Sequence, residues 1–112
     1  MQYYIYMIRC EDNSLYTGIT TDLKRRFKEH TSQKGAGAKY THVRKPIKIE
    51  AAWETENGKG AALKLEAYLK KLKKCDKEKL VLTPHNLSEY LDERFEEFVF
   101  TVVNMHTTDA EV

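Results

Sequence analysis

The sequence predicts a small α+β fold, because segments with strand character alternate with segments of helical spacing. Residues 3–9 and 15–19 are rich in aromatic and β-branched residues, which favour strands. The turn-forming residues 11–13 separate these two segments, so we expect a β-hairpin. Apolar residues recur at helical spacing over 23–32 and again before residue 74, which predicts two helices.

Two of the predicted strands indicate how the sheet is built. Both faces of residues 3–9 are apolar, which is typical of a strand at the centre of a sheet. Residues 47–54 alternate apolar and polar side chains, so they predict a strand with one buried face. The apolar positions of that strand are Ile47, Ile49, Ala51 and Trp53. The hairpin register decides whether Tyr6 and Tyr16 share a face, and the sequence leaves both possibilities open.

Length and composition place the chain among single globular domains. A chain of 112 residues is expected to form one domain. Its 41% apolar and 32% charged residues exclude the composition of a disordered chain. No apolar run approaches the roughly 20 residues of a membrane-spanning helix, and the first residues lack the features of a signal peptide. Cys10 and Cys75 lack C-x-x-C spacing, so we expect reduced thiols and a cytoplasmic protein.

Charge is distributed unevenly along the chain. Residues 1–74 contain 16 Lys and Arg against 8 Asp and Glu, a charge of +8. Residues 75–112 contain 3 Lys and Arg against 9 Asp and Glu, a charge of −6. A basic body suggests an anionic partner such as nucleic acid, although ordinary surface charge gives the same numbers. We therefore expect a domain over residues 1–84 and an acidic C-terminal extension over 85–112.

Two polar residues of the first helix lie beside its buried stripe. Leu23 and Phe27 are four residues apart and predict that apolar stripe. Arg26 and His30 are also four apart and flank the stripe, next to the strand that carries Tyr6. These side chains are candidates for a reactive site. The structural alternative is an arginine whose methylenes cover the core and a histidine that caps the helix.

A glycine and a basic loop predict contacts with nucleic acid. Gly18, in the second strand, suggests a bulge or the close approach of another group to the backbone. Residues 33–46 look like a connecting loop whose cations suit phosphate contacts and whose tyrosine could stack on a base. The candidate contacts of this loop are Lys34, Lys39, Tyr40 and Arg44. A solvated connecting loop is the structural alternative.

The second helix carries one carboxylate among several lysines. Its inner face is lined by Ala62, Leu65, Leu69 and Leu72. Glu66 lies at the edge of that face, on the same side as Lys70 and Lys73. This arrangement suggests a metal-binding glutamate beside phosphate-binding lysines. The structural alternative is a Glu66–Lys70 ion pair at i, i+4 spacing, worth about 0.3–0.5 kcal/mol.

The acidic part of the chain has weaker patterns. Residues 76–82 predict a short helix, which Pro84 ends. Residues 87–95 have helical spacing, and residues 98–103 (FVFTVV) predict a further strand. Residues 105–112 are expected to form a loose end.

The residues assembled so far resemble the motifs of the GIY-YIG nuclease family. The first motif is matched loosely, with Tyr4 in place of the family's glycine, and Thr17 takes the variable middle place of the second. An arginine, a histidine and a glutamate follow in the family's order and spacing. The matching residues are Tyr4-Ile5-Tyr6, Tyr16-Thr17-Gly18, Arg26, His30 and Glu66. The resemblance covers roughly residues 3–82 and is greatest to small stand-alone bacterial members.

This resemblance implies both a fold and an activity. It implies a three-stranded antiparallel sheet flanked by helices. It also implies an endonuclease that hydrolyses DNA with one divalent ion, Mg²⁺ or Mn²⁺, bound by Glu66. Relatives of this kind serve DNA repair and recombination, where branched or single-stranded DNA is a substrate. Several relatives have a lysine directly after the second motif, where this chain has Ile19, so another cation must take any role of that lysine.

The resemblance also implies roles for the reactive side chains. Tyr6 is the expected general base, Arg26 binds the phosphate, and Tyr16 or His30 positions the water or the phosphate. A tyrosine has an unperturbed pKa of about 10, so Tyr6 needs a nearby cation such as Arg26 or the metal. His30, with an ordinary pKa of about 6.5, is the rival base. The competing hypothesis is a module of the same fold that binds nucleic acid without cleaving it.

Overall fold

The computed structural model describes residues 1–32 and 44–103, and all structural statements concern these ranges. Strands β1 (Tyr3–Cys10) and β2 (Leu15–Thr20) form the predicted hairpin, and helix α1 (Leu23–Ser32) follows. Strand β3 (Pro46–Thr55) leads into helices α3 (Lys59–Lys70) and α4 (Lys74–Leu82). Two short 3₁₀ helices, η1 (Pro84–Tyr90) and η2 (Glu93–Phe95), precede strand β4 (Thr101–Val102).

The sheet has four antiparallel strands in the order β2-β1-β3-β4. Strand β1 pairs with β2 on one side and β3 on the other, which confirms its predicted central place. The expectation of a three-stranded sheet is wrong, because β4 pairs with the free edge of β3. Trp53 lies opposite Val102, and the Val103 amide donates to the Ala52 carbonyl at 2.9 Å. The segment predicted as a strand over 98–103 thus forms only a two-residue strand.

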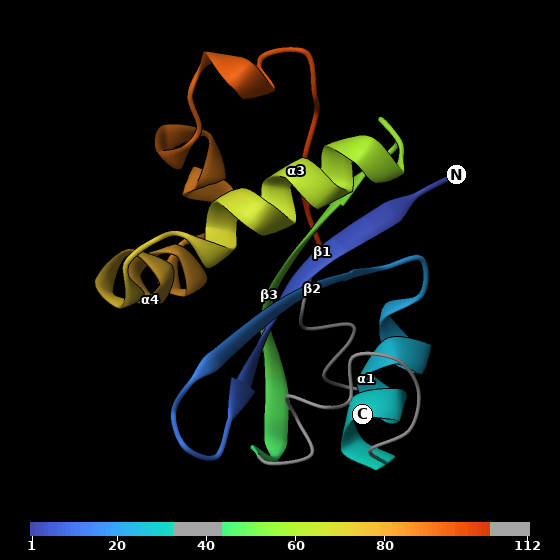
Figure 1. The fold of residues 1–112 in the computed structure, drawn as a ribbon, viewed down its shortest axis with the longest axis vertical. Coiled ribbons are helices and arrows are strands. Elements are labelled where there is room, and N and C mark those ends of the chain that lie inside the picture. Colours follow the sequence, from blue (N-terminus) through green and yellow to red (C-terminus); the bar gives the residue numbers. More distant parts are fainter. Residues whose placement is uncertain (33–43, 104–112) are drawn as a thin grey trace.

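Helices cover both faces of the sheet (Figure 1). Helix α3, helix α4 and the segment 84–100 cover one face, over a core that includes Ile5, Trp53 and Leu65. Helix α1 covers the other face, where Phe27 packs in one cluster with Tyr6 and Ile8. The apolar residues on both faces of β1 therefore belong to two separate cores.

The side chains of strand β3 do not alternate between two faces as predicted, because its pairing with β1 contains a register shift. Met7 lies opposite Ala51 whereas Ile8 lies opposite Ile49, so Glu50 is an extra residue in β3. As a result Ile49 packs on the α1 side while Trp53 packs on the α3 side. The prediction of one shared apolar face for Ile47, Ile49, Ala51 and Trp53 is wrong, and Ile47 is 56% exposed.

The segment after α4 is attached to the sheet by apolar side chains. Leu87 and Phe95 are buried in the core under α3, with exposures of 4% and 6%. The Trp53 indole N–H donates to the Pro84 carbonyl at 2.8 Å, and the Tyr68 hydroxyl donates to the Tyr90 carbonyl at 2.6 Å. The acidic residues 84–103 therefore share a core with the basic domain. The expected loose end, 105–112, lies outside the described residues.

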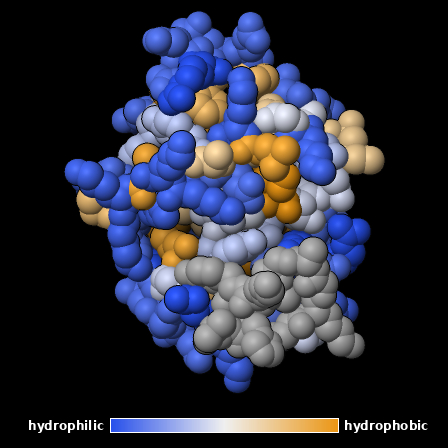
Figure 2. Space-filling view, viewed as in Figure 1, coloured by the Kyte–Doolittle hydropathy of each residue, from blue (hydrophilic) through white to orange (hydrophobic). Residues whose placement is uncertain are grey.

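One face of the molecule is mainly hydrophilic. Figure 2 shows a largely polar face on which apolar atoms form separate small patches. None of the helices within 1–32 and 44–103 has both the length and the apolar character that crossing a membrane requires.

Candidate active site

Tyr6 is the centre of a polar cluster on the α1 side of the sheet. It lies opposite Gly18, and Ile8 lies opposite Tyr16, so this register puts Tyr6, Gly18 and Tyr16 on one face. The ring centroids of Tyr6 and Tyr16 are 6.3 Å apart. The register question that the sequence left open is thus answered in favour of a shared face.

Helix α1 brings His30 to the Tyr6 hydroxyl. Asp22 starts the helix by accepting a hydrogen bond from the Arg25 amide at 3.0 Å. Phe27 then packs into the core on the Tyr6 side, which turns His30 inward, where it is fully buried. Tyr6 Oη and His30 Nε2 are 3.0 Å apart, and the His30 ring also lies 5.1 Å from that of Tyr16.

Arg26 is the second group on the Tyr6 hydroxyl. Its Nε donates to Tyr6 Oη at 3.4 Å, a long contact, and its Nη1 donates to Glu29 Oε1 at 2.7 Å. The Arg26 side chain is 14% exposed, so it is largely but not fully buried. Glu29, which was not among the predicted site residues, thus holds the guanidinium of Arg26 by an ion pair. Its i, i+3 spacing to Arg26 is the signal that could have revealed it.

Burial keeps both ionisable groups of the central hydrogen bond neutral. It raises the pKa of Tyr6 to about 12, and the Arg26 hydrogen bond offsets only part of this effect, while Tyr16 and Glu66 add to it. Burial, with the Arg26 charge, lowers the pKa of His30 to about 4. At neutral pH the Tyr6 hydroxyl and the His30 imidazole are therefore both neutral, and the tautomer of His30 sets which of them donates. The Tyr6 oxygen also accepts from Arg26 Nε.

We predict that His30 makes the stability of the protein depend on pH. The folded protein resists protonation of His30, whereas the unfolded chain takes up that proton near pH 6.5. The free energy of unfolding should be largest above pH 6.5 and fall towards pH 4, by about 3 kcal/mol in total. Urea unfolding between pH 7 and pH 4 measures this change.

The control for this prediction is His30→Gln, which keeps a polar side chain but does not titrate. Its free energy of unfolding should fall less over the same pH range. Equal pH dependence in the wild type and in His30→Gln would contradict a buried, neutral His30.

Gly18 leaves room for the Tyr6 ring. A Cβ atom at this position would lie 2.5 Å from Tyr6 Oη and 2.7 Å from Tyr6 Cζ, closer than real Cβ contacts allow. The sequence indicated that another group comes close to the backbone at Gly18, and the structure shows that this group is the Tyr6 side chain. A role of Gly18 in nucleic-acid binding stays a prediction.

Gly18→Ala is therefore expected to displace Tyr6. The forced shift should lower the free energy of unfolding by about 1–3 kcal/mol, as overpacking does. The matched control is Gly60→Ala in α3, where nothing lies within 4 Å of an added Cβ and helix propensity favours alanine. Thermal melts of both variants test the prediction, and equal melting temperatures would rule out this role of Gly18.

Glu66 approaches the same cluster from α3. Its side chain is 18% exposed, and Lys70 Nζ lies 3.5 Å from Glu66 Oε2. Lys70 Nζ also lies 5.9 Å from the centre of the Tyr16 ring, so the Glu66–Lys70 pair borders the tyrosines. Within 1–32 and 44–103, no three His, Cys, Asp or Glu side chains form a metal-ligand cluster. A single carboxylate such as Glu66 is compatible with Mg²⁺, which often binds through one or two carboxylates and keeps several water ligands.

Two of the other predicted nucleic-acid contacts, Arg44 and Lys73, lie elsewhere in the described fold. Arg44 Nε pairs with Asp12 Oδ2 at 3.0 Å, at the turn of the hairpin. Lys73 is exposed, directly before α4. Lys34, Lys39 and Tyr40 lie outside the described residues.

Comparison with known proteins places the chain in a family. The profile of the GIY-YIG catalytic domain matches residues 2–79, which contain every residue of the Tyr6 cluster. A UPF0213 protein of Vibrio cholerae is 47% identical over 79 residues, 70% of this chain and 76% of that protein. The UPF0213 protein YazA of Bacillus subtilis is 40% identical over 87 residues, 78% of this chain and 85% of that protein.

A solved structure is also similar to the chain. It is the solution structure of the UPF0213 protein BH0048 from Bacillus halodurans, with 44% identity and a TM-score of 0.45. The similarity covers 72% of this chain and 83% of that one. The names of these relatives, which are small stand-alone bacterial proteins, specify no activity. By its match to the catalytic domain and its identity to these relatives, the chain belongs to the GIY-YIG nuclease family.

Proposed function

We propose that this chain is a metal-dependent endonuclease that hydrolyses DNA phosphodiester bonds. The observation that carries the proposal is the contact of one buried hydroxyl, that of Tyr6, with both His30 and Arg26. A tyrosine that serves only the core needs one hydrogen-bond partner. A histidine and an arginine on the same oxygen supply a proton acceptor and a cation for phosphate, which are the groups that phosphodiester hydrolysis requires.

The proton of the attacking water is the first requirement. The Tyr6 oxygen takes this proton as the Tyr6 hydroxyl passes its own proton to His30 Nε2, so a neutral tyrosine and a neutral histidine act as one base. The depressed pKa of His30 opposes this transfer in the free protein. A phosphodiester anion bound beside the ring favours the imidazolium and reduces that penalty. In this proposal Tyr6 and His30 are partners rather than rival bases.

Charge on the phosphoryl oxygens is the second requirement. Arg26 presents a guanidinium that matches two phosphoryl oxygens and stabilises the charge that develops on them. Glu29 holds Arg26 in place through the 2.7 Å ion pair. Tyr16 lies close enough to His30 and Tyr6 to help position the phosphate.

Glu66 is the residue that would hold the divalent ion, Mg²⁺ or Mn²⁺. When bound, such an ion supplies positive charge to the phosphate and to the leaving oxygen. The carboxylate fits this role because it is partly exposed and borders the tyrosines. The Lys70 ion pair competes only weakly, since i, i+4 pairs contribute about 0.3–0.5 kcal/mol. Lys70 and Lys73, together with the cations of residues 34–44, would bind the DNA backbone.

Glu66→Gln is predicted to lose metal-dependent cleavage and to keep its affinity for DNA. The change removes a metal ligand from an exposed helix edge and leaves the core intact. The test uses a plasmid and a branched DNA with Mg²⁺ or Mn²⁺, with EDTA as the reference. The branched DNA probes a role in repair or recombination, which is the finer part of the proposal.

The matched control is Glu56→Gln, which removes an exposed carboxylate outside the Tyr6 cluster. It should cleave at the wild-type rate. Retained turnover of Glu66→Gln at saturating Mg²⁺ would refute the metal role. A wild type that binds DNA and never cleaves it would instead support the binding module.

A further inference from the structure

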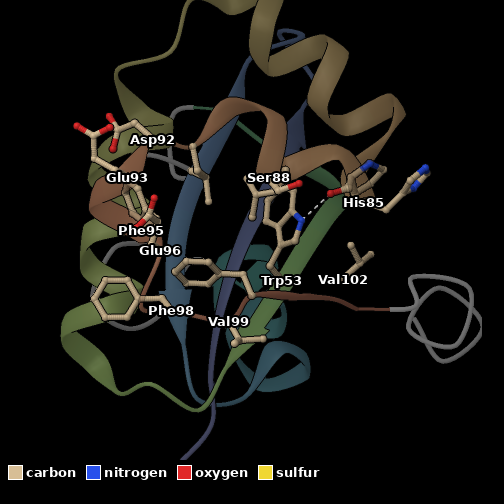
Figure 3. Close-up of a pocket in the computed structure, with 14 residues that line it drawn as sticks. Trp53, His85, Ser88, Asp92, Glu93, Phe95, Glu96, Phe98, Val99 and Val102 are labelled. Carbon is tan, nitrogen blue, oxygen red and sulfur yellow. Dashed lines mark hydrogen bonds between the residues drawn. The ribbon is translucent and has the colours of Figure 1, made fainter.

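The segment after α4 and the sheet form the walls of an open cavity, on the face opposite Tyr6. This C-terminal cavity has a volume of about 550 Å³ and lies between Trp53 of β3 and the segment 84–102 (Figure 3). Trp53 packs in the core under α3, whereas Tyr6 packs in the core under α1. The C-terminal cavity and the Tyr6 cluster are thus separated by the sheet. Every lining residue except Trp53 lies beyond the family match of 2–79.

Aromatic and aliphatic side chains form most of the wall. The rings of Phe95, Phe98 and Phe100 lie 6.2–6.5 Å apart and pack against one another. Val99 is 69% exposed, so apolar surface continues to the opening. The surface that the wall exposes is nevertheless more polar than apolar. The volume lies within the roughly 300–1,000 Å³ that is typical of small-molecule sites.

The charged residues of the wall have one sign. Asp92, Glu93 and Glu96 line the C-terminal cavity, and none of the described lining residues is Lys or Arg. Figure 3 shows these three at one end, beside Phe95, while His85 and Val102 lie at the other end. Arg94 pairs with Asp92 at 2.7 Å, and Glu93 and Glu96 are exposed acids at the same end. The wall is therefore acidic in a protein whose first 74 residues carry +8.

The geometry points to a binding site for a small organic cation that carries an apolar ring or chain. The apolar part would pack against the partly exposed rings of Phe98 and Phe100, and aromatic rings also attract cations. The charged part would pair with Glu93 and Glu96 at the acidic end. An anion would be repelled by Glu93 and Glu96, and a neutral ligand would gain no ion pair from them. This inference does not depend on the proposed nuclease activity.

Trp53 gives a direct readout of occupancy, because it is the single tryptophan of the chain and lines the C-terminal cavity. The probe is benzyltrimethylammonium, titrated into the full chain while the tryptophan fluorescence is recorded. Benzyl alcohol and benzoate are the neutral and anionic references. We expect saturable binding of the cation, weaker binding of the alcohol and the weakest binding of benzoate.

Variants that remove acidic charge test whether the cation binds in the C-terminal cavity. Glu93→Gln combined with Glu96→Gln should weaken binding of benzyltrimethylammonium roughly two- to thirtyfold, the range for two exposed ion pairs. The matched control is Glu89→Gln combined with Glu97→Gln, two exposed acids of the same segment that do not line the cavity. The control should bind like the wild type. Thermal melts establish that both double variants fold.

Four outcomes would overturn the inference. The first is a lack of saturable binding by the wild type, and the second is equal affinity for the cation and benzyl alcohol. The third is a lysine-rich peptide that binds and is not displaced by benzyltrimethylammonium, which would make the occupant a basic protein segment. The fourth is a wild type that sediments as a dimer and a Val99→Lys variant that sediments as a monomer. This result would make the occupant a second copy of this chain.

Discussion

Replacing Tyr6 by phenylalanine is expected to slow single-turnover cleavage of DNA by about 10²–10⁴-fold. The change removes the hydroxyl that contacts His30 Nε2 and Arg26 Nε and leaves the ring in place. In the proposed reaction the water then has no oxygen to receive its proton. Single-turnover rates with a labelled plasmid measure the loss without interference from product release.

The same variant should also lose stability, by about 1–3 kcal/mol, because Nε2 of the buried His30 loses its hydrogen bond with the Tyr6 hydroxyl. Stability alone therefore does not distinguish a reactive tyrosine from a structural one. The assay must run well below the melting temperature of Tyr6→Phe, with the half-buried Tyr4→Phe as a control expected to cleave normally. A folded Tyr6→Phe that cleaves at the wild-type rate while His30→Ala does not would make His30 the base alone.

Ending the chain after Thr83 is expected to abolish cooperative folding. It removes β4 and the buried side chains of Leu87 and Phe95. Truncating a buried leucine or phenylalanine to alanine costs about 2–5 kcal/mol each, and a whole domain is stable by only about 5–15 kcal/mol. The truncated chain should therefore lack a sharp thermal transition in circular dichroism.

Phe95→Ala in the full chain is the graded control for the truncation. It should lower the free energy of unfolding by about 3–5 kcal/mol while the chain still folds. A truncated protein that melts cooperatively within a few degrees of the full chain would contradict the role of the segment 84–103. The acidic extension would then be separable from the domain, and its effect on DNA affinity could be measured by removing it.

Local patterns in the sequence predict much of the fold. The hairpin, α1 and the central place of β1 follow from turn residues, helical spacing and the two apolar faces of one strand. The extra residue at Glu50 and the pairing of β4 with β3 depend on contacts between distant segments, so alternation alone does not reveal them. Arg9 and Glu78 form a partly buried ion pair although they are 69 residues apart. No local pattern in the sequence predicts this pair.

The sequence predicts which residues form the candidate site, but it does not predict the pKa values of Tyr6 and His30. Helical spacing placed Arg26 and His30 on one side of α1, and the structure brings both to Tyr6. We expected the cation Arg26 to favour an ionised tyrosine. Burial is the larger effect, and it raises the Tyr6 pKa to about 12 and lowers that of His30 to about 4. Burial depends on how α1 packs, which no residue pattern specifies.

The measurement that tests the central claim most directly is nicking of a supercoiled plasmid by the purified wild type and by Arg26→Ala. Arg26 is the cation on the Tyr6 hydroxyl, and its loss removes phosphate stabilisation from the proposed reaction. We predict Mg²⁺-dependent nicking by the wild type, none in EDTA, and a loss of activity in folded Arg26→Ala. Plasmid that stays supercoiled with the wild type in Mg²⁺ and in Mn²⁺, or is nicked equally fast by Arg26→Ala, would contradict the claim.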